Sequence, residues 1–285
     1  MKVGIIGLGK MGEAMAGHVL TRGEDSLAVF DLDSIPVDRV SEKGAQKCAD
    51  VRELANFSEL VIICVATDQQ VLDVISEIAE SDTATTLVIA STVHPATIIE
   101  AAQSIADTNL KLVDSPVVFG SAGARDGNLL CLCGGDESDI EFIRPALMAF
   151  SRDVVRVGPL GHGQMAKAVN NMLHWAHCVS NFEALALAKR FGLDAQNLRE
   201  ILLRSPGTNG TLETWDDTYL TWQEKDMDIV MDLAQTAGVT MPLFGQVDQL
   251  VKTISHDDIQ DLLYGDKATY IGQIIAGDSD LLGGN

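Results

Sequence analysis

The chain has few basic residues for its number of acidic ones: 20 Lys and Arg stand against 41 Asp and Glu, which gives a formal net charge of −21 over 285 residues. So acidic a surface repels phosphate backbones, and nucleic acid is therefore not expected as a partner. No apolar run reaches the roughly 18 residues of a membrane-spanning helix, and the first residues show no basic, apolar and cleavable signal pattern. We expect a soluble cytoplasmic protein that has no membrane partner.

Disulfide and metal patterns are also missing. The five cysteines form no CxxC pair, and Cys131 and Cys133 fall in an apolar segment, so we interpret the cysteines as reduced core residues. The six histidines show no HExxH spacing. His174 and His177 are spaced as two ligands on one helix face could be, but no carboxylate or cysteine obviously joins them. The sequence therefore predicts no metal site.

The N-terminus carries a glycine-rich turn between a short apolar strand, 2–6, and a helix over 13–22. The turn has a GxGxxG pattern and reads Gly7, Leu8, Gly9, Lys10, Met11, Gly12. In this context Gly7 permits the tight turn, Gly9 lets a pyrophosphate approach the backbone, and Gly12 lets helix and strand pack closely. The free N–H groups and the dipole at the helix start favour the phosphates. We predict that these six residues bind a dinucleotide.

An acidic residue ends the second expected strand, 27–30. Asp31 lies about two dozen residues past Gly7, where a carboxylate that binds the adenosine ribose is expected. Such a carboxylate repels the additional phosphate of NADP, and no arginine stands at the next three positions. We therefore predict NAD rather than NADP as the preferred cofactor. The alternative is that Asp31 serves only the turn, together with Asp33 and Ser34.

Short apolar strands alternate with helices up to about residue 158. Further strands are expected at 60–65, 86–90, 110–113, 129–133 and 154–157. The alternation predicts an α/β fold, an N-terminal Rossmann domain with a doubly wound parallel sheet, in which ligands bind at the carboxyl ends of the strands. Val65, Ala66 and Thr92 stand at those ends, and we add them to the predicted cofactor site.

After residue 160 the strand signals vanish and helices dominate. We therefore expect an NAD(P)-binding Rossmann domain over 1–160 and an all-α substrate and dimerisation domain over 161–285. Helices are predicted at 195–204, 226–237, 245–252 and 266–275, and the tail from 278 is expected to be frayed. So helical a second half must bury its apolar faces somewhere, which favours a homodimer or homotetramer.

A long helix over 161–189 opens this second half. Its apolar residues recur at spacings of three and four, so one broad face is expected to be buried. Lys167 and Asn171 are four residues apart and share one side of the helix, and Asn170 adds a second amide. Taken alone, Lys167 is most simply interpreted as a surface lysine whose stem lies along the helix.

Four blocks, in order, resemble one family, the β-hydroxyacid dehydrogenases of the 3-hydroxyisobutyrate dehydrogenase type. The blocks are GLGKMGEAMAGHVL at 7–20, DSPVVFGSAGARDGNL at 114–129, GHGQMAKAVNN at 161–171 and EKDMDIVMDLAQTAGVTMPL at 224–243. The resemblance covers nearly the whole chain, and its third block, GxGxxxKxxNN, is the most specific.

The resemblance implies hydride transfer between NAD(P) and a β-hydroxy acid or its semialdehyde, with Lys167 as the catalytic general acid and base. A lysine can relay this proton if burial lowers its pKa. Asn171 would bind the same substrate or hold Lys167. Lys225 would lie near the substrate or the nicotinamide, whereas Asp226 would be a structural residue at a helix start.

The second block departs from the family pattern, which reads DAPVSGG. In the resemblance, Ser-Gly-Gly binds the acid group of the substrate, and here Val118, Phe119 and Gly120 replace it. A hydroxyl is lost and a large ring replaces a glycine. We therefore expect a substrate other than plain 3-hydroxyisobutyrate, either larger or less dependent on a carboxylate. Asn170 and His174, on the long helix, complete the predicted substrate set.

Other functions stay open from the sequence. The related decarboxylating 6-phosphogluconate dehydrogenases carry His at the position of Asn170, which argues against their reaction. Imine reductases share the architecture but usually lack the lysine found at Lys167. A non-catalytic NAD-sensing module is the remaining alternative, and the combination of Lys167, Asn171 and Lys225 argues against it.

Overall fold

The computed structural model describes the chain except residues 23–25, 82, 84, 279–280 and 282–285, so most of the tail predicted to be frayed lies outside the described residues. The chain divides into two compact units, Met1–Lys167 and Ala168–Asn285. Within the described residues, no helix combines the length and the apolar character needed to cross a membrane.

The first unit is built on one sheet with nine strands in the described residues, and β3, β2, β1, β4, β5 and β6 follow one another in parallel. β8 runs antiparallel to β6 and β7, and β9 pairs with β8 in parallel. The parallel sheet predicted from the alternation is confirmed for most of its strands, and β8 is the exception because it runs antiparallel to β6 and β7. The strands are β1 (Lys2–Ile6), β2 (Ser26–Phe30), β3 (Gln46–Lys47), β4 (Leu60–Ile63), β5 (Thr86–Ile89), β6 (Lys111–Asp114), β7 (Val117–Val118), β8 (Leu129–Gly134) and β9 (Ser151–Gly158).

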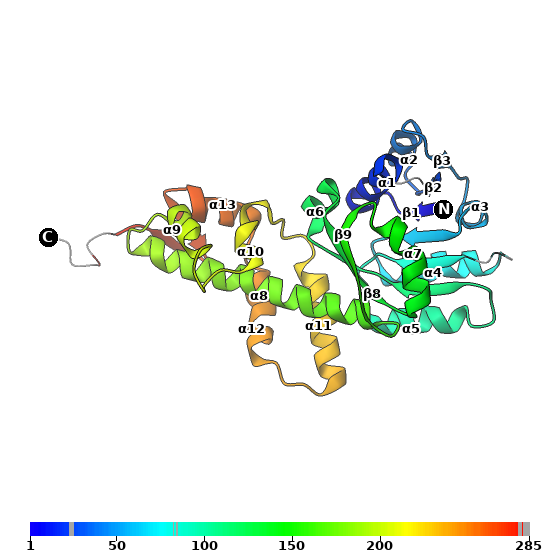
Figure 1. The fold of residues 1–285 in the computed structure, drawn as a ribbon. Helices are drawn as coiled ribbons and strands as arrows, with labels where there is room; N and C mark the ends of the chain where they lie inside the picture. Colours follow the sequence, from blue (N-terminus) through cyan, green and yellow to red (C-terminus); the bar gives the residue numbers. More distant parts are fainter. Residues whose placement is uncertain (23–25, 82, 84, 279–280, 282–285) are drawn as a thin grey trace. The chain divides into compact units, whose positions relative to one another are not determined.

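Helices cover both faces of this sheet (Figure 1). In β4, Leu60 and Ile62 belong to one apolar core, while Val61 and Ile63 belong to the other. Side chains alternate along a strand, so a continuous apolar run is buried on both faces. The first core is closed by α1 (Lys10–Arg22), α2 (Ser34–Ser41), α6 (Gly120–Asp126) and α7 (Glu137–Leu147), and the second by α3 (Val51–Phe57), α4 (Asp68–Ala79) and α5 (Pro95–Ser104).

The second unit is helical, as predicted, but it is not all-α, because it also contains one β-hairpin. Its apolar faces form one core that includes Phe182 and Trp215, both fully buried. The longest helix, α8, starts in the first unit and continues through the second. The helices are α8 (His162–Arg190), α9 (Ala195–Leu202), α10 (Gly210–Glu213), α11 (Gln223–Ala237), α12 (Pro242–Val251) and α13 (His256–Tyr264), with a 3₁₀ turn at Trp215–Asp217.

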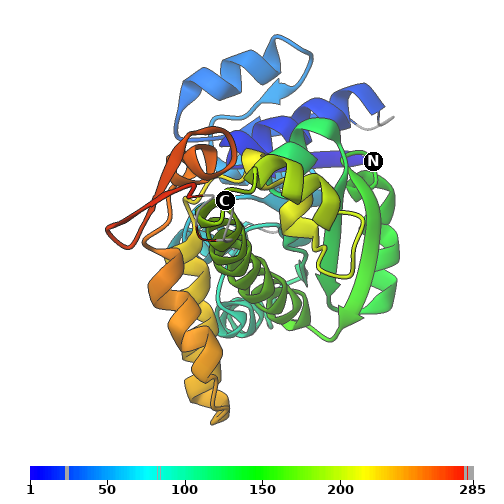
Figure 2. The same cartoon turned by 90° about the vertical axis from the view of Figure 1, so that its left-hand side faces the viewer.

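The helix predicted over 266–275 is wrong. This segment is an antiparallel hairpin of β10 (Lys267–Tyr270) and β11 (Gln273–Ala276), drawn in red in Figure 2. Its two turn residues, Ile271 and Gly272, have φ values of 48° and 75°, as a two-residue hairpin turn with two left-handed positions requires. Isoleucine is rare in that conformation, so Gly272 stands without the preceding asparagine or aspartate that would mark such a turn in the sequence.

Candidate active site

The predicted cofactor residues of the first unit follow strands that end side by side. Ile6 of β1 is in register with Phe30 of β2 and Ile63 of β4. In turn, Ile63 is in register with Ile89 of β5. The residues after these positions therefore line one edge of the sheet, the edge at which doubly wound folds bind ligands. They include Gly7, Asp31, Val65, Ala66 and Thr92.

The glycine loop after β1 meets the needs of a pyrophosphate. Gly7 has a φ of 89°, and a Cβ atom there would lie 2.3 Å from the carbonyl oxygen of Cys64. A Cβ atom on Gly12 would lie 1.9 Å from the carbonyl oxygen of Gly7, so α1 packs directly on the turn. At Gly9 nothing lies within 4 Å of the Cβ position. Gly7 and Gly12 therefore allow close backbone packing, and Gly9 leaves open space. This arrangement fits a dinucleotide bound at the start of α1.

Asp31 holds the same loop from the end of β2. Its Oδ2 accepts a hydrogen bond from the N–H of Leu8 at 2.5 Å, and its Oδ1 accepts one from the N–H of Asp33 at 2.8 Å. Asp31 therefore does serve as a turn residue, which was the alternative interpretation of the sequence. A carboxylate oxygen can accept a second hydrogen bond, so these contacts leave acceptor capacity for ribose hydroxyls.

The backbone donors after β4 are already engaged. Val65 donates its N–H to Ser91 Oγ at 2.8 Å, and Ala66 donates to Gln70 Oε1 at 2.9 Å. A cofactor at this edge would therefore have to use carbonyl oxygens or side chains of these two residues. The neighbouring loop, which contains Thr92, is held by Gln164, whose Nε2 donates to the Ser91 carbonyl at 2.8 Å.

The start of α8 is fixed by a buried carboxylate whose role the sequence pattern did not predict. Asp114, fully buried at the end of β6, accepts hydrogen bonds from the N–H groups of Gly161 at 2.7 Å and Gln164 at 2.8 Å. Desolvation raises the pKa of Asp114 even though these donors favour its charged form. A Cβ atom on Gly163 would lie 2.3 Å from the Leu132 carbonyl oxygen, so glycine is required there.

Lys167 follows this fixed turn by three residues and is half-buried. Asn171 comes one helical turn later on the same side of α8 and is buried. Asn170 is exposed, and its Nδ2 donates to Asn171 Oδ1 at 3.1 Å. The helix thus places a lysine and a buried amide in succession on one side.

In the second unit, α8 contacts the elements that carry the other predicted residues. His174 Nδ1 lies 2.9 Å from Thr211 Oγ1 of α10. Trp175 donates its ring N–H to Asp226 Oδ2 at 3.0 Å, which ties the first turn of α11 to α8. This is a structural contact of a buried acid, and Lys225, half-buried, precedes it.

The three residues that replace Ser-Gly-Gly behave differently from one another. Val118 is buried in β7, where it pairs with Leu130 of β8. Phe119 has a φ of 83° and is 50% exposed, and Gly120 has a φ of 54° at the start of α6. Only the phenylalanine ring and the glycine backbone are open to a substrate.

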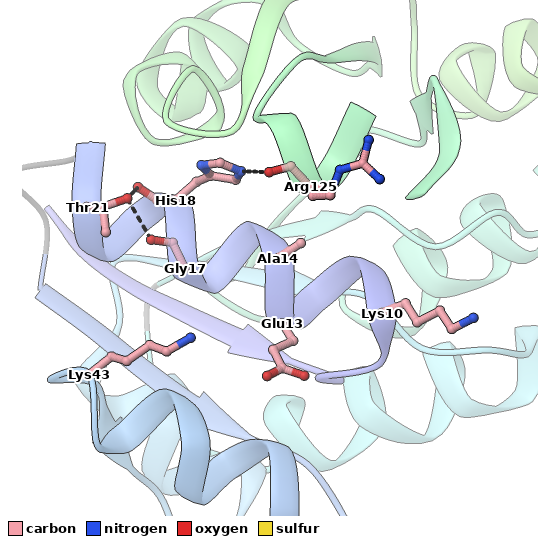
Figure 3. A pocket seen from close by; sticks show the side chains of 8 residues that line it. All are labelled: Lys10, Glu13, Ala14, Gly17, His18, Thr21, Lys43 and Arg125. Carbon is pink, nitrogen blue, oxygen red and sulfur yellow. Dashed lines mark hydrogen bonds between the residues drawn. The ribbon is translucent and has the colours of Figure 1, made fainter. Parts of the chain in front are cut away.

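The far end of α6 is tied to α1, as Figure 3 shows. The Nε2 atom of His18 lies 3.0 Å from the carbonyl oxygens of both Ala124 and Arg125. A hollow of about 490 Å³ runs along the same face of α1, and of the predicted site residues only Lys10 lines it. The hollow therefore does not coincide with the predicted site.

All five cysteines are free thiols. Burial raises the pKa of Cys131 and Cys178 to about 12 and that of Cys48, Cys64 and Cys133 to about 11. They are therefore neutral at physiological pH and do not resemble reactive thiolates.

Two family models match consecutive parts of the chain. Residues 2–158 match the NAD binding domain of 6-phosphogluconate dehydrogenase, and residues 161–263 match the model described as the NAD-binding part of NADP-dependent 3-hydroxyisobutyrate dehydrogenase. Together they span both units.

Relatives and solved structures agree with these models. The chain is 34% identical to NAD-dependent L-serine dehydrogenase of Pseudomonas aeruginosa, covering 75% of this chain and 73% of that one. It is 29% identical to 2-(hydroxymethyl)glutarate dehydrogenase of Eubacterium barkeri, covering 88% of each. Its fold is similar to that of Mycobacterium tuberculosis 3-hydroxyisobutyrate dehydrogenase, with a TM-score of 0.80, 23% identity and coverage of 88% and 92%. The chain therefore belongs to the 3-hydroxyisobutyrate dehydrogenase-like family of β-hydroxyacid dehydrogenases, and it is an NAD(P)-dependent dehydrogenase that acts on hydroxy acids.

Proposed function

We propose that this dehydrogenase oxidises a β-hydroxy acid, or reduces the corresponding semialdehyde, with Lys167 as general acid and base. The observation that carries the proposal is the placement of Lys167, half-buried and one turn past a helix start that Asp114 and Gln164 hold. NAD(P), when bound, supplies or accepts the hydride. Lys167 would take the hydroxyl proton during oxidation and return it during reduction, while Asn171 would orient the lysine or the substrate oxygen.

NAD is the proposed cofactor in preference to NADP. The support is Asp31, whose carboxylate is held at the end of β2 by two backbone N–H groups. The negative charge of Asp31 would repel the additional phosphate of NADP. The glycine loop would hold the pyrophosphate, and Val65, Ala66, Thr92 and Lys225 stay the further predicted cofactor contacts.

The proposed substrate is a small hydroxy acid or aldehyde other than plain 3-hydroxyisobutyrate. The relatives named for L-serine and 2-(hydroxymethyl)glutarate support this class. Phe119, Gly120, Asn170, Asn171, His174 and Lys225 stay the predicted substrate contacts; Val118, being buried, would act through the backbone. Residues 1–160 would serve as the cofactor domain and 161–285 as the substrate and dimerisation domain.

We also propose that the protein is a cytoplasmic homodimer or homotetramer. Three apolar side chains at successive turns of α8 support the oligomer: Met165, Val169 and Leu173 are 38%, 45% and 46% exposed. Exposed apolar side chains in a row are typical of an interface. Light scattering of the purified protein would measure the number of subunits, and cell fractionation would test the location.

The function is tested by following reduction of NAD and NADP with a panel of β-hydroxy acids, hydroxy aldehydes and amines. Lys167→Ala should lower kcat by about 100-fold to 10,000-fold, as loss of a general acid–base group does. Lys267→Ala, which removes an exposed lysine from β10, is the matched control and should be unchanged. Undiminished activity in Lys167→Ala, or activity on amines alone, would favour the imine-reductase alternative. Tight NAD binding without any turnover would favour the sensing module.

A further inference from the structure

Phe119 is held in a backbone conformation that phenylalanine rarely adopts. Its φ of 83° and ψ of 10° fall in the left-handed region, and among the described residues only Ile271 shares this feature without being glycine. Such a position costs about 1–3 kcal/mol and persists only when its surroundings hold it.

The segment that follows Phe119 is tightly packed. Phe119 directly precedes α6, whose last carbonyl groups accept contacts from His18 and, at 3.3 Å, from Arg22. A Cβ atom on Gly123 would lie 2.6 Å from the Phe119 Cβ, so the first turn of α6 packs tightly against it. The ring nevertheless stays half exposed, which means that its burial does not compensate for the strain.

The contact that the ring does make is with a cation. The guanidinium carbon of Arg152 lies 4.0 Å from the centroid of the Phe119 ring. The sheet register explains this meeting, because Val118 pairs with Leu130, and the adjacent Leu129 pairs with Ser151, next to Arg152. β8 runs antiparallel to β6, so its first residues and the start of β9 lie on the side of the sheet where β6 ends. This is the side on which ligands bind in such folds.

Arg152 is exposed, and none of the described carboxylates forms an ion pair with it. The neighbouring Asp153 accepts a hydrogen bond from the N–H of Val154 instead. A guanidinium that lies over an aromatic ring keeps its N–H donors, which lie in its own plane, available for a planar oxyanion.

We propose that Phe119 and Arg152 form a specificity site that binds a second oxyanion of the substrate, a carboxylate or sulfonate at the end away from the reacting hydroxyl. The inference rests on the proposed function and names its substrate class. The Phe119 ring orients the guanidinium beside the loop where the family pattern has Ser-Gly-Gly, and Arg152 supplies a charged, bidentate donor for the second oxyanion there.

The test compares 2-(hydroxymethyl)glutarate, which has two carboxylates, with 3-hydroxyisobutyrate, which has one. Arg152→Gln should lower kcat/KM for the first by about 10-fold to 100-fold, mainly through KM, because charge-assisted hydrogen bonds are lost. The kcat/KM for 3-hydroxyisobutyrate should change less than about threefold, since this substrate has no second carboxylate. Arg152→Lys should recover part of the loss, and Arg156→Gln, the same charge change on the same strand, should keep wild-type values.

Other outcomes would overturn the inference. An equal loss on both substrates, no loss on either, or a wild type that oxidises 3-hydroxyisobutyrate but not the dicarboxylate contradicts a second oxyanion site. A loss confined to the KM for NADP would assign Arg152 to the cofactor phosphate instead.

Calorimetric titration with glutarate separates this inference from the proposed function. Glutarate carries two carboxylates and no hydroxyl group. Glutarate binding that depends on Arg152, without turnover of any hydroxy acid, would contradict the proposed function alone. Turnover of hydroxy acids without an Arg152-dependent preference would contradict the oxyanion site alone, and absence of both would contradict both.

Discussion

At the residue scale, Asp31 shows how one carboxylate can hold the chain and still be placed for a ligand. Its two oxygens accept N–H groups on either side, from Leu8 in the glycine loop and Asp33 in the following turn. The same hydrogen bonds that make it a turn residue orient it at the edge of the sheet. The two roles therefore support each other.

Replacing Asp31 should change the choice of cofactor. Asp31→Asn keeps one acceptor for the loop but removes the charge, so the ratio of kcat/KM for NAD over NADP should fall by about 10-fold or more, where tenfold corresponds to about 1.4 kcal/mol. The measurement is steady-state kinetics in which the concentration of each cofactor is varied while the substrate concentration is held constant. Asp38→Asn, which removes an exposed acid of α2, is the control. An unchanged ratio would mean that Asp31 serves the turn only.

At the element scale, the most consequential feature is the docking of α8. Asp114 joins Gly161 across 47 positions and Gln164 joins Ser91 across 73 positions, so two distant strands position the first turn of the helix that carries Lys167. A helix start buried without such partners would leave N–H groups unsatisfied.

Asp114 should give the protein a pH dependence of a definite sign. Burial raises its pKa above the usual 3.8, so the native state holds the proton more tightly than the unfolded state does. Its contribution to stability is fully present below about pH 3.8 and is lost as the pH rises through the raised native pKa. The free energy of unfolding of the wild type, minus that of Asp114→Asn, should therefore fall as the pH rises from about 4. Urea unfolding at several pH values measures it.

Glu13 serves as a control for Asp114, because its contribution to stability should depend on pH with the opposite sign. Its hydrogen bonds to Arg39 lower its pKa from the usual 4.5. The stability it contributes is present above pH 4.5 and is lost as the pH falls through the native pKa. The free energy of unfolding of the wild type, minus that of Glu13→Gln, should therefore rise with pH. A slope of the same sign for both acids would contradict the assignment of Asp114.

The hairpin of β10 and β11 carries a strained turn that can be relieved. Ile271 has a φ of 48° and is 61% exposed, so its side chain packs little while its backbone is in the left-handed region. Ile271→Asn should raise the free energy of unfolding by about 1 kcal/mol, because asparagine followed by glycine suits this turn. Ile274→Asn, at an exposed strand position of the same hairpin, should not raise the free energy of unfolding. Equal effects of both variants in urea unfolding would argue against relief of backbone strain.

At the scale of the whole molecule, excess negative charge dominates. With a formal net charge of −21, the compact state suffers self-repulsion that salt screens. Raising NaCl from about 0.05 M to 0.5 M should raise the melting temperature by about 2–4 °C, the shift that about 1 kcal/mol produces in a domain of this size. Differential scanning calorimetry measures it, with sucrose at equal osmolality as the control. No shift, or a lower melting temperature, would mean that local ion pairs already compensate the charge.

The parts of this molecule that the sequence determined by itself are those encoded by local spacing. The apolar run at 60–65 predicts a strand buried on both faces, which the structure forms over Leu60–Ile63. The glycines at 7, 9 and 12 predict the turn between β1 and α1, because each pattern reflects residues close in the chain. The side shared by Lys167 and Asn171 follows from helical periodicity alone.

Only the tertiary structure decided the contacts between distant segments. The buried cap that Asp114 makes for α8, the support of the Thr92 loop by Gln164 and the stacking of Arg152 on Phe119 join elements whose meeting depends on sheet order and register. Tertiary packing also decided the antiparallel direction of β8 and the turn at Ile271, and in both places it overrode the local preference of the sequence. Periodicity specifies which face of an element is buried, but the partner of that face is selected by how the whole chain packs.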